Sequence, residues 1–234
     1  MPSSLSPSSL TDLARQLVPV IREAGDVIMA IYNTDFAVEY KGDASPVTEA
    51  AGHIPDVKGR FWLVDPLDGT KEFVNQNGEF TVIIALIDAG QAVLGLVYAP
   101  ALNQLYVGVE GQGAYLEEGG GKRVINTRTP PEEGLTVVAS RSHGDASALD
   151  EFLGGRKVAR TVGAGSSLKL CLVAAGEADV YPRLGRTMEW DIAAGHAVLA
   201  AAGGVLTHID GSDFEYGKPD FANPFFAAWG EGHH

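Results

Sequence analysis

Two apolar runs in the middle of the chain restrict its possible folds more than any other feature. Residues 80–87 and 92–98 are separated only by Asp88-Ala89-Gly90-Gln91, and a short turn between two apolar runs predicts a β-hairpin. Further strand-like runs lie on both sides, at 36–40, 61–64, 104–109 and 113–116. The first part of the chain is therefore predicted to form a largely antiparallel sheet.

Helical periodicity opens the chain and returns, mixed with strands, in its second part. Between residues 10 and 31 apolar side chains recur every three or four positions, which predicts an amphipathic helix containing Pro19. After Pro130-Pro131 the pattern alternates between strands and helices. The predicted strands there are 135–139, 158–162 and 179–181, and the predicted helices are 145–153, 167–175 and 192–202.

The double proline marks the expected boundary between two halves of one compact unit. Residues 1–9 are rich in serine and proline and are expected to form a flexible tail. An N-terminal α+β half is expected over residues 10–130 and a C-terminal α/β half over 131–234, with a cleft between them.

Charge and composition exclude several classes of protein. The 17 basic and 30 acidic residues give a formal net charge of −13, and so acidic a chain repels the backbone of nucleic acids. No stretch approaches the roughly 18 consecutive apolar residues of a membrane-spanning helix, and no signal-peptide pattern is present. The single cysteine, Cys171, has no partner for an internal disulfide. We expect a cytoplasmic protein without nucleic-acid polymers or integral membrane contacts; loose association with the inner membrane stays open.

Two aspartates flank a proline at the end of the predicted strand 61–64. The strand delivers Asp65 to its end, Pro66 interrupts regular pairing, and the turn brings Asp68 back beside Asp65. The carbonyl of Leu67 can point into the same space. Two carboxylates this close repel each other unless a cation lies between them, and hard oxygen ligands of this kind select Mg²⁺.

The residues after this turn are suited to a phosphate group. Gly69 and Thr70 open a helix or tight turn, whose free N–H groups can bind an anion. An ordinary turn, in which the aspartates are caps and solvated charges, explains the same residues equally well. Both interpretations stay open on this stretch alone.

A second acidic element precedes the last predicted helix. In Glu189-Trp190-Asp191-Ile192-Ala193-Ala194, Asp191 lies where an N-cap residue belongs, and simple capping explains it. An aspartate at a helix start can also face a metal across a cleft, with Trp190 forming a wall of that site.

Taken together, the two elements resemble a known signature pair. Asp65-Pro66-Leu67-Asp68-Gly69-Thr70 and Trp190-Asp191-Ile192-Ala193-Ala194 with the later Gly203-Gly204 resemble the motifs of the Mg²⁺-dependent, lithium-sensitive phosphatases. This superfamily includes inositol monophosphatase, fructose-1,6-bisphosphatase and 3′(2′),5′-bisphosphate nucleotidase. The segments that are similar to the bisphosphate nucleotidase (CysQ-type) branch are Lys71-Glu72-Phe73, Asn77-Gly78-Glu79-Phe80-Thr81-Val82, Ala139-Ser140-Arg141-Ser142-His143, Gly165-Ser166-Ser167-Leu168-Lys169, Ala178-Asp179-Val180-Tyr181-Pro182-Arg183 and Thr187-Met188-Glu189. The resemblance spans about residues 41–230.

The resemblance implies a fold, a reaction and a cofactor. The fold would be a layered αβαβα sandwich of the inositol monophosphatase and sugar phosphatase type, with the metal site between its halves. The reaction would remove the 3′-phosphate of adenosine 3′,5′-bisphosphate, giving AMP and phosphate, and would recycle a nucleotide by-product of sulfur assimilation. Two or three Mg²⁺ ions are expected in the active enzyme, and Li⁺ is expected to inhibit it. Monomer and dimer stay equally open.

The resemblance also implies roles for individual residues. Metal binding carries over onto Asp65, the Leu67 carbonyl, Asp68 and Asp191. Thr70, with Gly69, would contact the phosphate and orient the attacking water. The expected catalytic residues are therefore Asp65, Asp68, Thr70 and Asp191. Leu67, Asp68 and Asp191, together with Gly69 and Thr70, would also contact the substrate.

The second phosphate or the ribose of the nucleotide needs partners of its own. Arg141, Lys169 and Arg183 are the expected cationic contacts, and the expected hydroxyl donors are Ser140, Ser142 and Ser166. An ordinary surface charge or helix cap is the alternative for each. His143 is interpreted as a loop residue and Cys171 as part of the core.

One part of the family pattern has no counterpart in this chain. After Ser45-Pro46-Val47-Thr48-Glu49-Ala50 the pattern continues with an aspartate, a helix and a Glu-Glu loop, whereas here the strand to Asp65 follows almost at once. In the family that aspartate acts with the threonine on the water, and one glutamate is a metal ligand. Asp56 and Glu72 are not convincing replacements. Either the chain lacks the segment or a mobile segment is omitted from the sequence; the cost of deleting a core helix favours omission.

Three functions remain to be separated. The first is a Mg²⁺-dependent 3′(2′),5′-bisphosphate nucleotidase. The second keeps the same chemistry but acts on inositol monophosphate or a sugar bisphosphate. The third is a nucleotide-binding protein with an impaired metal site, which the missing carboxylates suggest.

Overall fold

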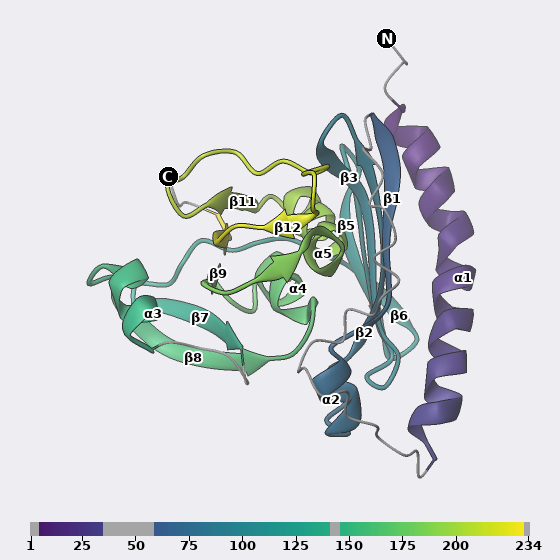
Figure 1. The fold of residues 1–234 in the computed structure, drawn as a ribbon, viewed down its shortest axis with the longest axis horizontal. Coiled ribbons are helices and arrows are strands. Elements are labelled where there is room, and N and C mark those ends of the chain that lie inside the picture. The colour runs from purple at the N-terminus through teal and green to yellow at the C-terminus, as the bar shows by residue number, and fades with distance from the viewer. Residues whose placement is uncertain (1–4, 35–58, 141–145, 232–234) are drawn as a thin grey trace.

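The computed structural model describes residues 5–34, 59–140 and 146–231. They form layers that alternate helix and sheet (Figure 1): helix α1 (Pro7–Tyr32), a six-stranded sheet, helices α4 (Leu168–Ala174) and α5 (Glu189–Ala201), a five-stranded sheet, and helix α3 (Ala146–Leu153). The predicted αβαβα sandwich is confirmed. The full sequence has 234 residues.

The six-stranded sheet is antiparallel throughout and follows the chain order. Its strands are β1 (Arg60–Asp68), β2 (Thr81–Asp88), β3 (Gln91–Ala99), β4 (Gln104–Val109), β5 (Gly113–Glu118) and β6 (Gly121–Ile125). The predicted hairpin joins β2 to β3, with Ala89 at φ 50° and Gly90 at φ 81° in the left-handed region that two-residue hairpin turns use. Strand β6 was not predicted, because this edge strand is almost wholly exposed and mostly polar.

The five-stranded sheet is mixed and has the order β11-β13-β9-β7-β8. Its strands are β7 (Leu135–Ser140), β8 (Val158–Ala164), β9 (Val180–Arg183), β11 (Val205–His208) and β13 (Phe226–Trp229). β7 runs parallel to β8 and β9, and α3 provides the crossover from β7 to β8. A short separate ladder joins β10 (Thr187–Met188) to β12 (Ala222–Asn223).

Helix α1 begins earlier than its apolar periodicity predicts. Ser6 is the N-cap residue and its Oγ accepts a hydrogen bond from the Ser9 N–H at 3.2 Å, while Pro7 stands at the first helical position, where its missing N–H is not needed. Residues 7–9 are therefore helical rather than part of the expected tail. The helix continues through Pro19. In the described part of the chain, no helix is both long and apolar enough to cross a membrane.

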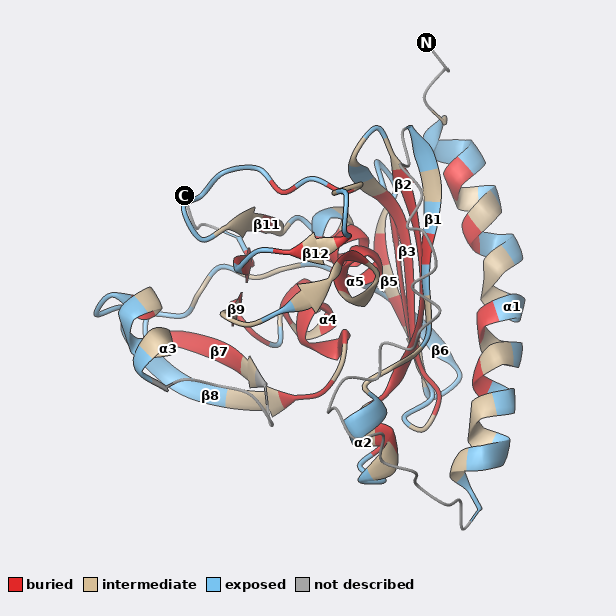
Figure 2. Cartoon of the chain, in the orientation of Figure 1, coloured by how far each residue is buried: buried red, intermediate tan, exposed pale blue. Residues whose placement is uncertain are grey.

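Helix α5 lies in the centre of the molecule and is buried along most of its length (Figure 2). It packs against the sheet at Gly95 of β3 and Gly108 of β4, which are paired across the ladder. A Cβ at Gly95 would overlap the Ala194 carbonyl, and one at Gly108 would overlap the backbone of Val198. The two glycines let the helix approach the sheet closely, and this fixes the position of the helix start.

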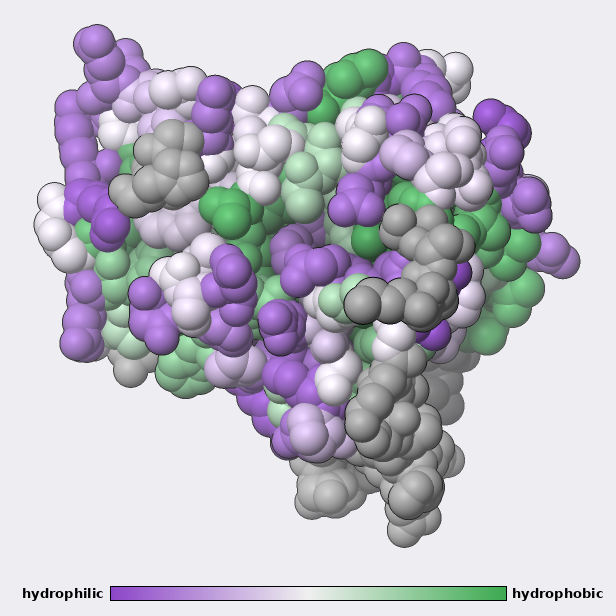
Figure 3. Space-filling model, turned by 90° about the horizontal axis from the view of Figure 1, so that it is seen from above, coloured by the Kyte–Doolittle hydropathy of each residue, from purple (hydrophilic) through white to green (hydrophobic). Residues whose placement is uncertain are grey.

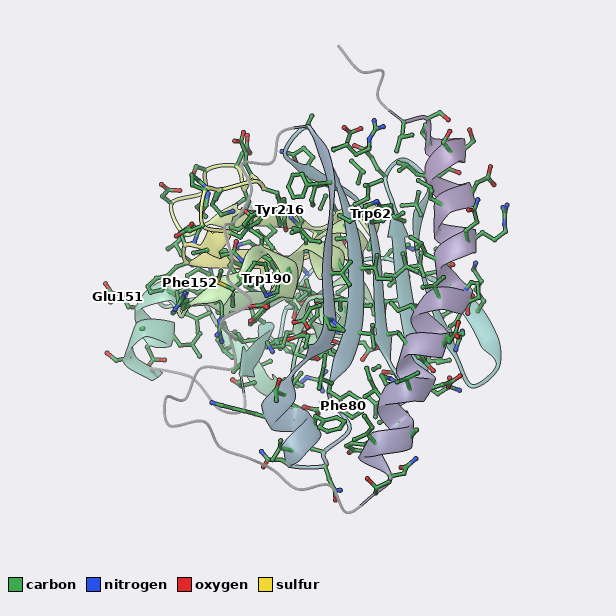
Figure 4. All side chains as sticks on the ribbon, turned by 45° about the vertical axis from the view of Figure 1, so that its right-hand side comes forward. Trp62, Phe80, Glu151, Phe152, Trp190 and Tyr216 are labelled. Carbon is green, nitrogen blue, oxygen red and sulfur yellow. The ribbon has the colours of Figure 1, made fainter. Side chains whose placement is uncertain are left out.

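A second apolar core lies between α1 and the six-stranded sheet, and it stays partly open within the described residues. α1 packs over β2, β3 and β4, whereas Trp62 and Val64 on the edge strand β1 point to the same face without being covered (Figure 4). With Val20, Val27 and Ile31 on α1, these side chains are 44–62% exposed. Seen from above, hydrophobic surface interrupts the hydrophilic surface on the α1 side of the molecule (Figure 3).

Candidate active site

An open pocket of about 150 Å³ gathers side chains from both halves of the chain. Asp68 and Gly69 reach it from the end of β1, Lys169 from α4 and Asp191 from α5. The complete lining is Asp68, Gly69, Lys71, Glu72, Ser166, Ser167, Lys169, Leu170, Tyr181, Arg183, Arg186, Thr187, Asp191 and Ile192. The structure thus brings together motifs that lie more than one hundred residues apart.

The end of β1 is irregular, as the proline predicts. The pairing of β1 with β2 shifts register between Asp65 and Asp68, and the strand resumes for one further pair at Asp68. Within this irregularity the Leu67 N–H donates to Asp65 Oδ1 at 2.9 Å. Gly69 follows at φ 86° and starts the short helix α2 (Thr70–Val74). The strand therefore extends to Asp68, beyond the predicted end.

Asp68 is held by residues from two other elements. Its Oδ2 accepts hydrogen bonds from the Ser167 N–H at 2.6 Å and from the Thr81 hydroxyl at 3.1 Å. Burial, together with the negative charges of Asp191 and Asp65, raises the pKa of Asp68 to about 7. Hydrogen bonds thus fix the orientation of the Asp68 carboxylate, whereas burial and the neighbouring negative charges destabilise its ionised form.

Asp191 lies at the start of α5, three residues beyond the N-cap position. Met188 is the N-cap residue, and its N–H donates to Asp191 Oδ2 at 2.8 Å, as an acidic third residue does in a capping box. Burial, reinforced by the charge of Asp65, raises the pKa of Asp191 to about 6. Trp190 packs against Phe221 and is not among the residues that line the pocket, and its role as a wall of a metal site stays a prediction.

The three aspartates share one arrangement that bears on cation binding. Each uses one carboxylate oxygen for hydrogen bonds, Asp65 through Oδ1 and Asp68 and Asp191 through Oδ2. The other oxygen of each accepts no hydrogen bond from the described residues. Free carboxylate oxygens with raised pKa values fit a hard cation such as Mg²⁺.

The same three side chains do not make a complete metal centre by themselves. No group of three or more histidine, cysteine, aspartate or glutamate side chains that could hold a metal occurs within residues 5–34, 59–140 and 146–231. Asp65 acts on the pKa values of Asp68 and Asp191 through its charge but does not line the pocket. The carboxylate oxygens are of the chemical kind that binds Mg²⁺, but by themselves they do not complete the coordination of an ion.

The pocket also contains cationic side chains. Lys169 is only 7% exposed, and its Nζ donates to the Ser166 carbonyl at 2.6 Å. Burial lowers the pKa of Lys169 to about 8, against the opposing effect of Asp68. Arg183 donates through Nη2 to the Arg186 carbonyl at 3.0 Å, and its Nε is buried without a partner among the described residues. Such side chains are suited to a second anionic group on a ligand.

Some predicted site residues lie elsewhere or outside the described residues. Thr70 begins α2 and is exposed without lining the pocket. The side chain of Ser140 and the residues Arg141, Ser142 and His143 lie outside the described residues, as do strand 36–40, Glu49 and Asp56. Ser166 lines the pocket with its Oγ buried and unpartnered in the described part of the molecule. Cys171 is buried, as predicted.

Sequence reasoning missed several residues of the lining. Ser167, Arg186 and Thr187 lie beside predicted residues, and Lys71 and Glu72 follow the aspartate motif directly. Their position next to predicted site residues in the sequence was the only signal that could have indicated them. Ser167 contributes its backbone N–H, which no side-chain pattern reveals.

The raised pKa of Asp68 gives a prediction for the metal-free protein. A carboxyl group with a raised pKa in the folded state stabilises the fold below about pH 4 and loses this contribution as the pH rises through about 7. In chelator at pH 8, Asp68→Asn should therefore increase the free energy of unfolding by about 1–3 kcal/mol. Urea denaturation at pH 4 and pH 8 measures this. A variant less stable than the parent at pH 8 would contradict it.

Comparisons with known proteins agree with this arrangement. Residues 48–229 match the model of the inositol monophosphatase family. The 3′(2′),5′-bisphosphate nucleotidase CysQ of Escherichia coli K12 is 45% identical over 244 aligned residues, covering 90% of this chain and 97% of that protein. The crystal structure of CysQ from Bacteroides thetaiotaomicron has a TM-score of 0.79 at 33% identity, covering 95% of this chain and 98% of that one. The inositol monophosphatase of Thermotoga maritima has a TM-score of 0.74 at 25% identity, covering 93% and 92%.

The same comparison shows that this chain is shorter than its relative inside the alignment. The 244 aligned positions contain only 90% of 234 residues, about 211, so about 33 positions of the Escherichia coli protein have no counterpart here. This agrees with the sequence pattern that stops after Ala50. The absence of about 33 positions is therefore a property of the 234-residue sequence as given.

Proposed function

The chain belongs to the inositol monophosphatase family, and on this premise we propose that it is a phosphatase that hydrolyses the 3′-phosphate of adenosine 3′,5′-bisphosphate. Water attacks the phosphorus, the bond to the 3′-oxygen breaks, and the products are AMP and inorganic phosphate. The curated relatives named as 3′(2′),5′-bisphosphate nucleotidases, at 45% identity over most of the chain, support this substrate.

The combination of acidic and basic side chains in one pocket is the observation that carries the proposal. Asp68 and Asp191 supply its acidic side chains, and Lys169 and Arg183 supply its basic ones. A substrate with two phosphates can place the reacting one against the carboxylates with their cations and the second against the basic side chains. A monophosphate would leave the basic side chains without an anionic partner.

Magnesium fits the acidic side chains. Asp65, Asp68, Asp191 and the carbonyl of Leu67 would hold it, through the oxygen atoms that the hydrogen bonds leave open. When bound, Mg²⁺ lowers the pKa of water and neutralises charge on the phosphate and the leaving oxygen. Two or three ions and inhibition by Li⁺ are part of the proposal.

The chain's own groups position the reactants. The Ser167 N–H and the Thr81 hydroxyl fix the orientation of Asp68, and the N–H of Met188 fixes that of Asp191. Gly69, at the pocket, and Thr70, one residue on, would contact the reacting phosphate and orient the water. Lys169 would bind the second phosphate, and its buried position strengthens that contact.

A comparison of substrates tests this assignment against other members of the family. We expect kcat/KM for adenosine 3′,5′-bisphosphate to exceed that for inositol monophosphate and for fructose 1,6-bisphosphate by at least about 100-fold, because neither of them presents a nucleoside between two phosphates. Phosphate release with Mg²⁺ and each substrate measures this. A preference for inositol monophosphate would contradict the nucleotide assignment and favour the alternative in which the substrate is inositol monophosphate or a sugar bisphosphate.

One observation favours a second function, nucleotide binding without turnover. The described residues contain no complete metal centre, and about 33 positions of the nucleotidase relative are missing. A chain with this function would bind adenosine 3′,5′-bisphosphate, measurable by calorimetry, and would release no phosphate with Mg²⁺.

The reaction fits a place in sulfur metabolism, where it would recycle a nucleotide by-product. We place it in the cytoplasm, with a small nucleotide as its partner. Monomer and dimer are equally compatible with this role.

A further inference from the structure

A three-residue loop joins the two halves of the pocket. Gly165, Ser166 and Ser167 connect the end of β8 to the start of α4, and two of them line the pocket. Ser166 has a φ of 45°, a left-handed backbone that residues other than glycine rarely adopt. The Oγ atoms of both serines are buried without a hydrogen-bond partner among the described residues. The loop therefore needs support from outside itself.

Carboxylates from the first half of the chain supply that support. Glu79, two residues before β2, accepts a hydrogen bond from the Gly165 N–H on Oε2 at 2.8 Å. Asp68 accepts one from the Ser167 N–H at 2.6 Å. The Asn77 side chain accepts from the Glu79 N–H at 2.9 Å, which shapes the turn that carries Glu79. Asp68 belongs to the reacting site, whereas Glu79 does not line the pocket.

The packing around Gly165 is close enough to make this support rigid. A Cβ at Gly165 would come within 2.5 Å of the Cγ of Glu72 and within 3.0 Å of Glu79. The two glutamates therefore lie directly against the backbone of the loop. A shift of Glu79 would be transmitted through Gly165 to Ser166, the next residue in the chain.

Lys169 depends on this loop for its position. Its Nζ donates to the Ser166 carbonyl at 2.6 Å, which is the acceptor that holds the buried ammonium group in the pocket. The charges of Glu72 and Glu79 also favour its protonated form. The loop thus links a carboxylate outside the pocket to the cation inside it.

We infer that Glu79 is a positioning residue for recognition of the second phosphate, acting through Gly165 and Ser166 on Lys169. The inference rests on the proposed function, because it assigns that phosphate to Lys169. Ser167 is held separately by its hydrogen bond to Asp68, so loss of Glu79 should affect mainly ligands that contact Lys169.

Kinetics with two nucleotides test the inference. Glu79→Ala should raise KM for adenosine 3′,5′-bisphosphate about 5- to 20-fold with kcat within about twofold, because contact with a non-reacting phosphate is equal in ground and transition states. KM for adenosine 3′-monophosphate, which lacks the second phosphate, should change less than about twofold. Glu79→Gln, whose amide oxygen can still accept from Gly165, should recover most of the loss. Equal effects on both nucleotides, or none on the bisphosphate, would overturn the inference.

Two controls separate this result from misfolding and from failure of the proposed function. Glu110→Ala removes an exposed carboxylate from the turn between β4 and β5 and should leave both KM values unchanged. In a Lys169→Met background, Glu79→Ala should add less than about twofold. If the parent releases no phosphate, the proposed activity fails, and the same contrast is then measured as dissociation constants of the two nucleotides by calorimetry.

Discussion

Asp68→Asn should lower kcat/KM for adenosine 3′,5′-bisphosphate at least about 1000-fold while the protein stays folded. The Asp68 carboxylate lies close enough to Asp191 and Asp65 for their negative charges to raise its pKa, and its own charge would help to bind a cation at this site. Asparagine keeps the shape and can still accept from Ser167, so the loss is one of charge. Phosphate release at saturating Mg²⁺ measures it.

The matched control for this substitution is Asp26→Asn on α1, an exposed aspartate remote from the pocket. It makes the same chemical change and should leave kcat/KM within about twofold. Retention of more than a tenth of the parent activity in Asp68→Asn would show that Asp68 is not part of the reacting site.

Gly108→Ala should lower the free energy of unfolding by about 3 kcal/mol. The new Cβ would overlap the backbone of Val198 and the carbonyl of Ala197 in the centre of α5. Because backbone atoms cannot give way as a flexible side chain can, the helix must move away from the sheet. Asp191, at the start of that helix, would move with it, so activity should fall as well.

Gly121→Ala provides the control for this change. Gly121 lies at the start of the edge strand β6, where the nearest atom to a new Cβ is the Glu118 carbonyl oxygen at 3.7 Å. Its stability should change by less than about 0.5 kcal/mol. Urea denaturation of both variants measures the difference, and equal stability of the two would contradict the close packing of α5.

Much of the fold could be predicted from the sequence because its strands carry their own signals. The hairpin of β2 and β3 has two long apolar runs around a short turn, and β4 was predicted with its observed bounds. β11 and β13 were missed, since each has only four residues and their pairing with each other and with β9 is set by tertiary contacts. Such short strands show no usable period.

The site could be predicted as a set of residues but not as a geometry. The aspartate motifs identified Asp68 and Asp191, and their signal was residue type and spacing. The hydrogen bond from Ser167 to Asp68 joins residues 99 positions apart through a backbone N–H, and the support of Gly165 by Glu79 does so over 86 positions. Contacts of this kind follow from the fold and have no sequence signature.

The effect of the missing positions on the reaction is the point on which the account depends most. The chain retains Asp65, Asp68 and Asp191, each with an oxygen free of hydrogen bonds from the described residues. The family's additional aspartate and glutamate would have come from the stretch that this chain lacks. Its activity therefore has to be measured on the 234-residue chain itself.

Phosphorus NMR of adenosine 3′,5′-bisphosphate incubated with the purified chain and Mg²⁺ tests the central claim most directly. The account predicts loss of the 3′-phosphate signal, appearance of one equivalent of inorganic phosphate, and retention of the 5′-phosphate as AMP. An unchanged spectrum from folded protein that binds the nucleotide would contradict it and establish binding without turnover. Loss of the 5′-phosphate instead would contradict the proposed orientation of the substrate.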